Sequence, residues 1–378
     1  MQKKVIALAV AALASSAAFA QTNVTIYGVV DASQQYVKSS GASNNGLNQN
    51  YVGRLESSNS YIGFKGVEDL GNGLKAIFLY ESNFAVDAGG RLDGGRDSYV
   101  GLTGGFGTVV AGNLTHPLRA FGAKTELAPG ATNFGTTESI TGRFAGVHTG
   151  AAVRAANAVA YVSPSFGGFS GTVAYVNGEN RTQDVGAVEG VNQKSWQIAA
   201  EYTNANLWAG VGYHRAVDTG ITAVAGAVPT LGASNGDNAA ITRVAAVYTL
   251  PTNTKLTALF DRTKVGGNGV LNVGTAKRNA YSLAVSQGFG KNTVGLAYAA
   301  SSDYKVDGDK QDNTGAKQVT VYYGYDLSKR TSILARYSRL SNEASVNNVW
   351  NVNPVNNGVN PGIGSDYTGY MVGLRHTF

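Results

Sequence analysis

The sequence predicts an all-β fold, a transmembrane antiparallel β-barrel of about sixteen strands with short periplasmic turns and long extracellular loops. Three observations lead to this fold class. Apolar residues alternate with small or polar ones along many stretches of about ten residues. Short turns and long polar connections follow each other in strict alternation. Charged residues make up only 14% of the chain, against roughly a quarter in an ordinary soluble domain, while Gly and Tyr are frequent.

The first twenty residues have the pattern of a secretory signal peptide. Lys3 and Lys4 give a positive start, a short apolar stretch follows, and Ala18-Phe19-Ala20 matches a cleavage site. We therefore expect a signal peptide, 1–20, and one barrel domain, 21–378. The chain contains no Cys, so the exported fold relies on backbone pairing rather than disulfides. Past the signal peptide no apolar run of 18 residues occurs, which excludes a spanning helix.

The remaining chain divides into strands and two kinds of connection. Tight turns rich in Gly, Asn, Asp and Pro alternate with long polar loops, a sorting that a β-sandwich does not show. An even number of strands brings both ends to the same side of the membrane. The expected strands are 22–37, 57–67, 73–84, 96–103, 106–113, 157–164, 168–177, 194–203, 206–217, 240–249, 254–264, 277–287, 292–301, 316–325, 330–340 and 366–378. The long loops are 38–56, 85–95, 114–156, 178–193, 218–239, 265–276, 302–315 and 341–365.

The last expected strand shows the two-faced pattern most clearly. One face is mostly apolar and flanked by aromatics, and the other is small or charged, as lipid outside and water inside require. An ordinary edge strand that ends in Phe would show the same alternation, so the other connections have to decide between the two. The first face holds Phe378, His376, Leu374, Val372 and Tyr370, and the second holds Thr377, Arg375, Gly373, Met371 and Gly369.

Several segments resemble the general diffusion porins of beta-proteobacteria, the neisserial type of the Gram-negative porin family. They occur in order over nearly the whole chain past the signal peptide. The resemblance implies a homotrimeric porin of the outer membrane whose third loop folds into the lumen. It also implies that the barrel-assembly machinery reads the final aromatic residue, Phe378. The matching segments are Val24-Thr-Ile-Tyr-Gly-Val-Val-Asp31, residues 63–78, Arg96-Asp-Ser-Tyr-Val-Gly-Leu102, Phe106-Gly-Thr-Val109, Asn157-Ala-Val-Ala-Tyr-Val-Ser-Pro164 and Gly373-Leu-Arg-His-Thr-Phe378.

The sequence departs from this family's pattern where selectivity is set. Many members carry an Arg two residues before the Gly of a Gly-x-Lys-Gly motif in the second strand, and here that position is Tyr61. Many carry a Gly-Arg pair after the fifth strand, and here the pair is Gly112-Asn113. We therefore expect a wider or less charged eyelet and only a mild preference for anions.

The longest connection, 114–156, has 43 residues and is expected to be functional because ordinary connections are far shorter. By the resemblance it is the constriction loop. Opposite charges on the loop and on the barrel wall would set ion preference at the narrow point. The loop candidates are Arg119, Lys124, Glu126, Glu138, Arg143 and Arg154. The wall and lumen candidates are Tyr61, Lys65, Lys75, Glu81, Arg96, Arg336 and Arg375.

Each wall candidate lies on the expected non-lipid face of its strand. A Lys or Arg facing lipid at the midplane would cost roughly 2–4 kcal/mol, which favours an inward direction. The competing interpretation is that each is a solvated lumen residue without effect on selectivity. Aromatic residues lie mostly towards strand ends, as in interface girdles.

These observations predict a water-filled channel of the outer membrane for passive diffusion of small hydrophilic solutes and ions, without a cofactor, a metal or a catalysed reaction. The expected partners are outer-membrane lipid, two further copies of the chain, the solutes and the barrel-assembly machinery. Nucleic acid is not expected, since the net charge of +6 is not gathered into any basic cluster.

Two other classes of function stay open from the sequence. One is an adhesion or ligand-binding barrel that acts through long loops such as 341–365 above a plugged lumen. The other is an enzyme barrel with a Ser/His dyad formed in space. The four His residues have no metal-ligand spacing, and no HExxH motif occurs.

Overall fold

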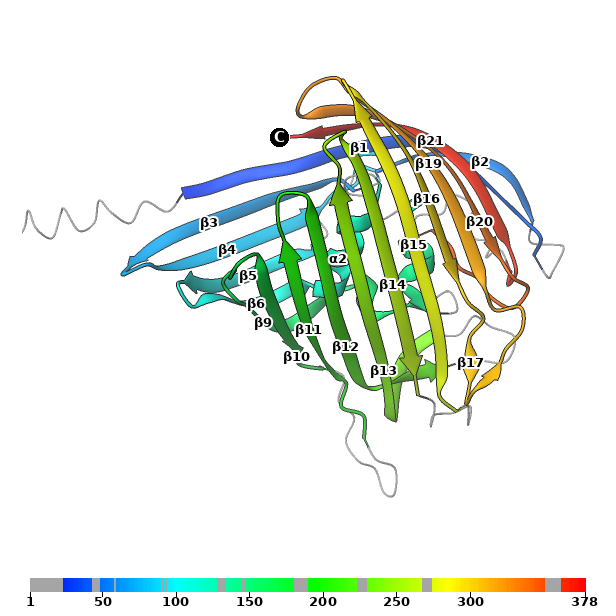
Figure 1. The fold of residues 1–378 in the computed structure, drawn as a ribbon, viewed down its shortest axis with the longest axis horizontal. Coiled ribbons are helices and arrows are strands. Elements are labelled where there is room, and N and C mark those ends of the chain that lie inside the picture. The colour runs from blue at the N-terminus through cyan, green and yellow to red at the C-terminus, as the bar shows by residue number, and fades with distance from the viewer. Residues whose placement is uncertain are drawn as a thin grey trace, which may run out of the picture.

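The computed structural model is a closed barrel of antiparallel strands, with helices enclosed by the ring of strands (Figure 1). It describes residues 23–42, 48–57, 59–89, 92, 94–127, 134–144, 147–179, 190–222, 230–266, 274–350 and 362–378. The expected signal peptide, 1–20, lies outside the described residues. Within these ranges, no helix is both long enough and apolar enough to cross a membrane.

The barrel has sixteen strands, as predicted. Nineteen strands share one sheet, but β2 (Gln49–Glu56) and β3 (Tyr61–Gly71) are two parts of one interrupted strand, because both pair with β1 (Asn23–Ser40). The short β17 (Lys305–Val306) and β18 (Asp309–Lys310) form a hairpin at the rim. The other strands are β4 (Leu74–Asn83), β5 (Gly95–Gly104), β6 (Gly107–Thr115), β9 (Arg154–Val162), β10 (Phe169–Val176), β11 (Lys194–Thr203), β12 (Leu207–Thr222), β13 (Thr230–Thr249), β14 (Thr254–Val265), β15 (Ala276–Phe289), β16 (Asn292–Ser301), β19 (Ala316–Asp326), β20 (Thr331–Asn342) and β21 (Asp366–Thr377).

The final strand closes the ring. β21 pairs with β1 from Val29 opposite Thr377 to Ser40 opposite Asp366. The backbone of Phe378 exchanges two hydrogen bonds with Gly28, of 3.2 and 3.1 Å. The terminal pattern therefore belongs to a barrel strand with neighbours on both sides and not to an open edge.

The connections are sorted to the two ends of the barrel, with the tight turns and the C-terminus at the same end (Figure 1). Between β3 and β4, Asn72 takes a φ of 52°, flanked by Gly71 and Gly73. At the other end some strands run further than predicted: β2 lies inside the expected loop 38–56, and β12 and β13 reach into 218–239. Strand that extends beyond the lipid needs no apolar outer face, so its sequence does not show the alternation.

The outer and inner faces differ as a membrane barrel requires. Large apolar side chains such as Val372 and Leu374 are about half exposed on the outside, at 56% and 51%. The residues between them turn inward, and many of these are buried polar groups. A continuous belt of exposed apolar side chains around a closed sheet is a lipid-facing surface.

The interior holds most of the connection between β6 and β9. This connection, the inner loop, comprises residues 116–153 and contains α2 (Pro117–Thr125), α3 (Glu138–Thr141), the hairpin of β7 (Arg143–Phe144) and β8 (Val147–His148), and the 3-10 helix η2 (Gly150–Ala152). Figure 1 shows its helices inside the ring of strands. The largest buried cluster lies where this loop meets the wall, with Phe134, Ile140 and Phe144 against Trp350 and Tyr367.

Candidate pore constriction

The first helix of the inner loop packs tightly onto one part of the wall. Leu118 and Phe121 of α2 are fully buried against β12 and its neighbours. A Cβ at Gly210 would lie 2.8 Å from the Phe121 ring, and one at Gly212 would lie 2.7 Å from Leu118. These two inward-facing glycines of β12 therefore make room for the helix, because any side chain there would displace it.

Arg243 of β13 fixes this helix electrostatically. Its guanidinium donates to both carboxylate oxygens of Asp261 on β14, at 2.6 and 2.5 Å, and both side chains are 1% exposed. A third bond of 2.6 Å goes to the carbonyl oxygen of Leu118 in α2. The bidentate pair satisfies the charges, and a further donor of the same guanidinium holds the helix through the Leu118 carbonyl.

A second row of wall side chains holds the returning part of the inner loop by its backbone. Gln318 of β19 donates to the Thr136 carbonyl at 2.9 Å, and Thr320 donates to the Gly135 carbonyl at 2.8 Å. Arg336 of β20 donates to the Phe134 carbonyl at 2.8 Å. Arg278 of β15 donates to the Ile140 carbonyl. The inner loop is therefore attached to a continuous wall from β12 to β20, here called the loop-bearing wall.

A second connection also turns inward, which the sequence did not indicate. After β20, residues 343–350 lead to Trp350, which is 1% exposed. Its indole donates to Gln318 at 3.0 Å, and its ring lies 4.7 Å from that of Phe134. This part of the expected loop 341–365 therefore packs on the inner loop; residues 351–361 lie outside the described part.

The opposite wall, formed by β1, β3, β4 and β5, carries side chains that the loop does not cover; we call it the open wall. Arg96 and Glu81 form an ion pair of 2.9 Å, and the guanidinium lies 4.0 Å from the ring centre of Tyr61. The hydroxyl of Tyr27 donates to the other Glu81 oxygen at 2.7 Å. Tyr61 faces inward, because its cross-strand partner on β1 is the inward-facing Val29.

Further ion pairs complete the ring around this space. Arg375 of β21 pairs with Asp31 of β1 at 2.9 Å. Arg154 pairs with Asp97 at 2.8 Å. The sequence reasoning missed Asp31 and Asp97, as well as Tyr27. The period-two pattern of β1 contained a signal for Asp31, because it shares a face with the residues that turn away from lipid.

Two lysines of the open wall form no ion pair in the described part of the chain. Lys65 of β3 lies 5.1 Å from the ring centre of Tyr27, and no ion pair involves it. Lys75 of β4 is exposed next to the tight turn, with Asp69 as its cross-strand partner. Both share the inward parity of their strands.

The two acidic residues of the inner loop, Glu126 and Glu138, lie within the packing of the loop and do not face the open wall as expected. Glu126 accepts hydrogen bonds from the Thr137 hydroxyl and the Glu138 backbone, and burial raises its pKa to about 7. Burial also raises the pKa of Glu138, whose carboxylate lies 3.6 Å from Arg119 of the same loop. The two acids are therefore used within the loop, because a buried carboxylate needs donors close by.

Three predicted cations also have other surroundings than expected. The guanidinium of Arg336 donates to the Phe134 carbonyl and does not point into the space open to solutes. Arg143 is 5% exposed inside the loop packing, and burial lowers its pKa to about 10. Lys124 extends from the end of α2 to Glu201 of β11, at 2.6 Å. The structure brings together Tyr61, Glu81, Arg96, Arg119, Arg154 and Arg375 around one space and leaves these three outside it.

Two of the four histidines, His116 and His214, belong to the packing between the inner loop and the wall. His116 and His214 have ring centres 5.5 Å apart; one is bonded to the Gly150 carbonyl and the other to Gln197. Both form part of the seat of the inner loop. In the described ranges no group of three or more metal-binding side chains occurs.

Comparison with known proteins agrees with this architecture. A family model described as Gram-negative porin matches residues 7–345. Outer membrane porin protein 32 of Delftia acidovorans is 33% identical over the full length of both chains. Major outer membrane protein P.IB of Neisseria gonorrhoeae is 31% identical, over 88% of this chain and 92% of the relative.

Solved structures show the same arrangement of strands. The anion-selective porin from Comamonas acidovorans superposes with a TM-score of 0.72 and 28% identity, covering 95% of this chain and all of the other. OmpT of Vibrio cholerae in its trimer form has a TM-score of 0.63 at 15% identity, which is evidence for the fold alone.

Proposed function

The chain belongs to the Gram-negative porin family, and on that premise we propose how its interior controls the passage of solutes. It is a porin of the cell outer membrane, a water-filled channel for passive diffusion of small hydrophilic solutes and ions. We propose that the inner loop constricts the lumen between itself and the open wall. The observation that carries this proposal is the row of hydrogen bonds between loop carbonyls and the loop-bearing wall.

We further propose that the constriction is nearly neutral and prefers anions only mildly. Four cations around it are each matched by an acid: Arg96 by Glu81, Arg375 by Asp31, Arg154 by Asp97 and Arg119 by Glu138. The unmatched charge beside the constriction is that of Lys65, because Lys75 lies next to the tight turn, opposite Asp69. A single surplus positive charge at a narrow point favours anions modestly, because opposite neighbours cancel much of the remaining field.

Two proposals about assembly also rest on membership of the porin family. We propose a homotrimer, as the family resemblance implies; OmpT of Vibrio cholerae, which has a similar fold, is described in a trimer form. We also propose that Phe378 is read by the barrel-assembly machinery, since it is 41% exposed at the turn end of the barrel. A surface adhesion function is less favoured, because Val346, Asn347, Asn348 and Trp350 of the connection 341–365 are buried.

The test is a recording in planar lipid bilayers with a salt gradient. The wild type is expected to show stepwise conductance, and its absence would contradict the channel. Lys65→Gln is expected to shift the reversal potential toward cation preference, and Tyr61→Arg toward anion preference. Lys317→Gln removes the same charge from the outer face and should change nothing. If Lys65→Gln also changes nothing, Lys65 does not set the preference.

A further inference from the structure

Strand β4 of the open wall departs from the alternation that the spanning strands otherwise follow. Its middle reads Ala76-Ile77-Phe78-Leu79-Tyr80, an unbroken apolar run. Phe78 and Tyr80 are exposed on the outer face, at 37% and 43%, so Ile77 and Leu79 turn into the lumen. A strand with lipid on one side and water on the other needs apolar residues on one face only. The run therefore puts apolar side chains where a water-filled channel is expected to be polar.

The neighbouring strands extend this apolar surface along two rows of directly opposed residues. In the first row Leu79 lies opposite Tyr99 of β5. In the second row Ile77 lies opposite Val67 of β3, and on its other side come a glycine of β5 and then Val110 of β6. Directly opposed residues of antiparallel strands point to the same side of the sheet. We call these side chains the inner apolar band: Val67, Ile77, Leu79, Tyr99 and Val110.

Packing of the inner loop does not account for this band. α2 packs mainly against β11 to β14, and α3 packs mainly against β14 to β16 and β19. On the loop-bearing wall, inward-facing Leu259 shares a buried cluster with Phe121 of α2. The buried cluster beside the band, around Ala158 and Ala160, contains no residue of the inner loop in the described ranges. The band is therefore left partly exposed, with Val67 at 45%, although folding gains nothing from apolar surface in water.

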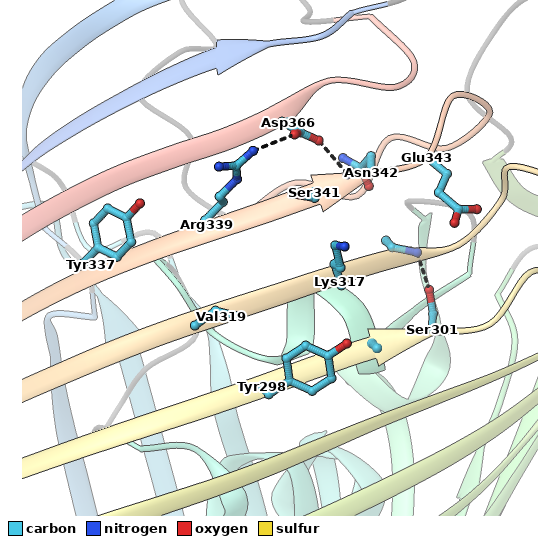
Figure 2. Close-up of a pocket in the computed structure, with 12 residues that line it drawn as sticks. Tyr298, Ser301, Lys317, Val319, Tyr337, Arg339, Ser341, Asn342, Glu343 and Asp366 are labelled. Atoms are coloured by element: carbon cyan, nitrogen blue, oxygen red, sulfur yellow. Dashed lines mark hydrogen bonds and ion pairs between the residues drawn. The ribbon is translucent and has the colours of Figure 1, made fainter.

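Apolar and basic side chains also lie together on the outer face, where the membrane explains the apolar part. Figure 2 shows Tyr298, Val319 and Tyr337 of β16, β19 and β20 near Lys317 and Arg339. The three apolar side chains are exposed members of the lipid-facing belt. Membrane lipid does not enter the lumen of a closed barrel, so the inner apolar band has a different partner, a solute on its way through the channel.

A cation without an acidic partner lies at one edge of the band. Lys65 of β3 is directly opposite Leu79, on the side away from β5. Its side chain is exposed, its ammonium lies 5.1 Å from the ring centre of Tyr27, and no ion pair among the described residues involves it. Glu81, two residues beyond Leu79, is already matched by Arg96. An incoming anion therefore meets a single cation next to an apolar surface.

We propose that Lys65 and the inner apolar band bind aromatic monocarboxylates in transit, a role that rests on the proposed diffusion channel. The carboxylate accepts charge-assisted hydrogen bonds from the Lys65 ammonium. The ring attached to it then lies over Leu79, which is one strand away at about 4.8 Å, and a longer body reaches Tyr99 at about 10 Å. The site is directly beside the constriction, because Leu79 and Glu81 face inward on the same strand.

Two tyrosines favour an aromatic body over an aliphatic one. Tyr27 lies beside Lys65, and Tyr99 lies beside Leu79 on the next strand. Tyr27 already pairs edge-to-face with Tyr61, with ring centres 6.2 Å apart, so its ring is held in a fixed direction. A solute ring between such rings gains the edge-to-face or offset contacts that a saturated chain cannot make.

The test uses planar-bilayer recordings of the full chain in chloride, with benzoate, acetate and benzamide as probes. The fraction of the chloride current that each probe blocks gives its apparent affinity. Benzoate is expected to bind on the order of tenfold more tightly than acetate, because one face of its ring leaves water for the band. Benzamide has the ring without the charge and should bind more weakly than benzoate.

Substitutions separate the apolar part of the site from the charged part. Leu79→Gln is expected to remove most of the difference between benzoate and acetate, and Ile77→Gln, in the next row, should reduce it. Lys65→Gln should weaken binding of both carboxylates and leave benzamide unchanged. The control Leu327→Gln makes the same change at an exposed residue of the tight turn after β19 and should keep the wild-type preference.

Stepwise chloride conductance shows that a variant has folded, and its absence in the wild type would contradict the channel itself. The aromatic site alone is overturned if a conducting wild type binds benzoate no more tightly than acetate. It is also overturned if both Leu79→Gln and Ile77→Gln keep the preference for benzoate, or if Leu327→Gln loses it to the same extent. Unchanged binding of both carboxylates to Lys65→Gln would likewise overturn it.

Discussion

The loop-bearing wall and the open wall use the same residue type in different ways. On the loop-bearing wall, Arg243 and Arg336 point inward and donate to carbonyl oxygens of the inner loop. On the other side of the lumen, Arg96 of the open wall and Arg375 of the adjoining strand β21 point inward and pair with carboxylates beside open space. An inward-facing arginine is therefore a structural anchor on one side of the lumen and an electrostatic group on the other.

The difference lies in what stands opposite each side chain. A buried backbone carbonyl that has left the sheet needs a donor, and a long guanidinium supplies it from the wall. Where no backbone approaches, the same group needs an anionic partner or water. Face alternation along a strand thus indicates which residues enter the lumen but not which of them reach the solute.

The largest effect is expected for Arg243→Ala, which removes the main anchor of the inner loop on the loop-bearing wall. It leaves Asp261 buried without its partner and frees the Leu118 carbonyl, so we expect a loss of about 3–5 kcal/mol of stability. Denaturant unfolding in detergent measures this loss, and bilayer recordings should show noisier and larger conductance as α2 leaves the wall. The matched change Arg96→Ala, at a partly exposed pair, should cost only about 1 kcal/mol. Equal losses in the two variants would mean that the two walls do not differ as described.

The next largest effect is the pH dependence of folding stability that arises from Glu126 of the inner loop. The pKa of Glu126, about 7 in the folded protein, lies above its ordinary value near 4.5, so the folded state binds this proton more tightly. Stability from this group is therefore greatest below about pH 4.5 and falls as pH rises to about 7, by about 3 kcal/mol in all. Glu126→Gln should remove that part of the pH dependence.

Thermal unfolding at pH 5 and pH 8 checks the prediction for Glu126. The midpoint of the wild type should fall more between these two values than that of Glu126→Gln. Glu68→Gln, at an exposed carboxylate of β3, serves as the control and should behave like the wild type. An identical pH response in all three proteins would argue against a buried, readily protonated Glu126.

The smallest expected effect is on ion selectivity, which should respond to an arginine of the open wall and not to one of the loop-bearing wall. Arg96→Gln leaves Glu81 unpaired at the open wall, so the permeability ratio should shift toward cations by roughly fivefold, or about 1 kcal/mol at short range in water. Arg336→Gln removes the same charge from the loop-bearing wall and should leave the ratio unchanged while it alters loop seating. Reversal potentials measure both. A similar shift in both variants would show that Arg336 faces the solute path after all.

The barrel could be predicted from the sequence because every strand that crosses the lipid must alternate apolar residues with small or polar ones. Leu256, Phe260 and Leu283 must face lipid, so strand number, closure and faces followed from period two and turn residues. Strand segments beyond the lipid, such as the whole of β2, could not be predicted in this way, because they carry no alternating apolar pattern. The position of the inner loop followed from its length and from family resemblance.

The partners of individual charges could not be predicted in the same way. Arg336 and Arg375 look alike in sequence, since both alternate with apolar residues. Their difference depends on Phe134 and Asp31, which lie far away in the chain. The same holds for Glu126, whose donors come from a turn eleven residues later. Such contacts depend on how the inner loop folds back on itself, and this folding produces no periodic pattern in the sequence.

Closure of the ring by β1 and β21 has a consequence for the folding route. Arg375 and Asp31, which meet across that seam, are 344 residues apart. Contacts this remote form late, because chain entropy opposes them until the intervening strands are in place. Until then the sheet has two free margins of unpaired N–H and C=O groups, each able to pair with another unfinished copy. The barrel is therefore most vulnerable to aggregation just before it becomes most resistant to it.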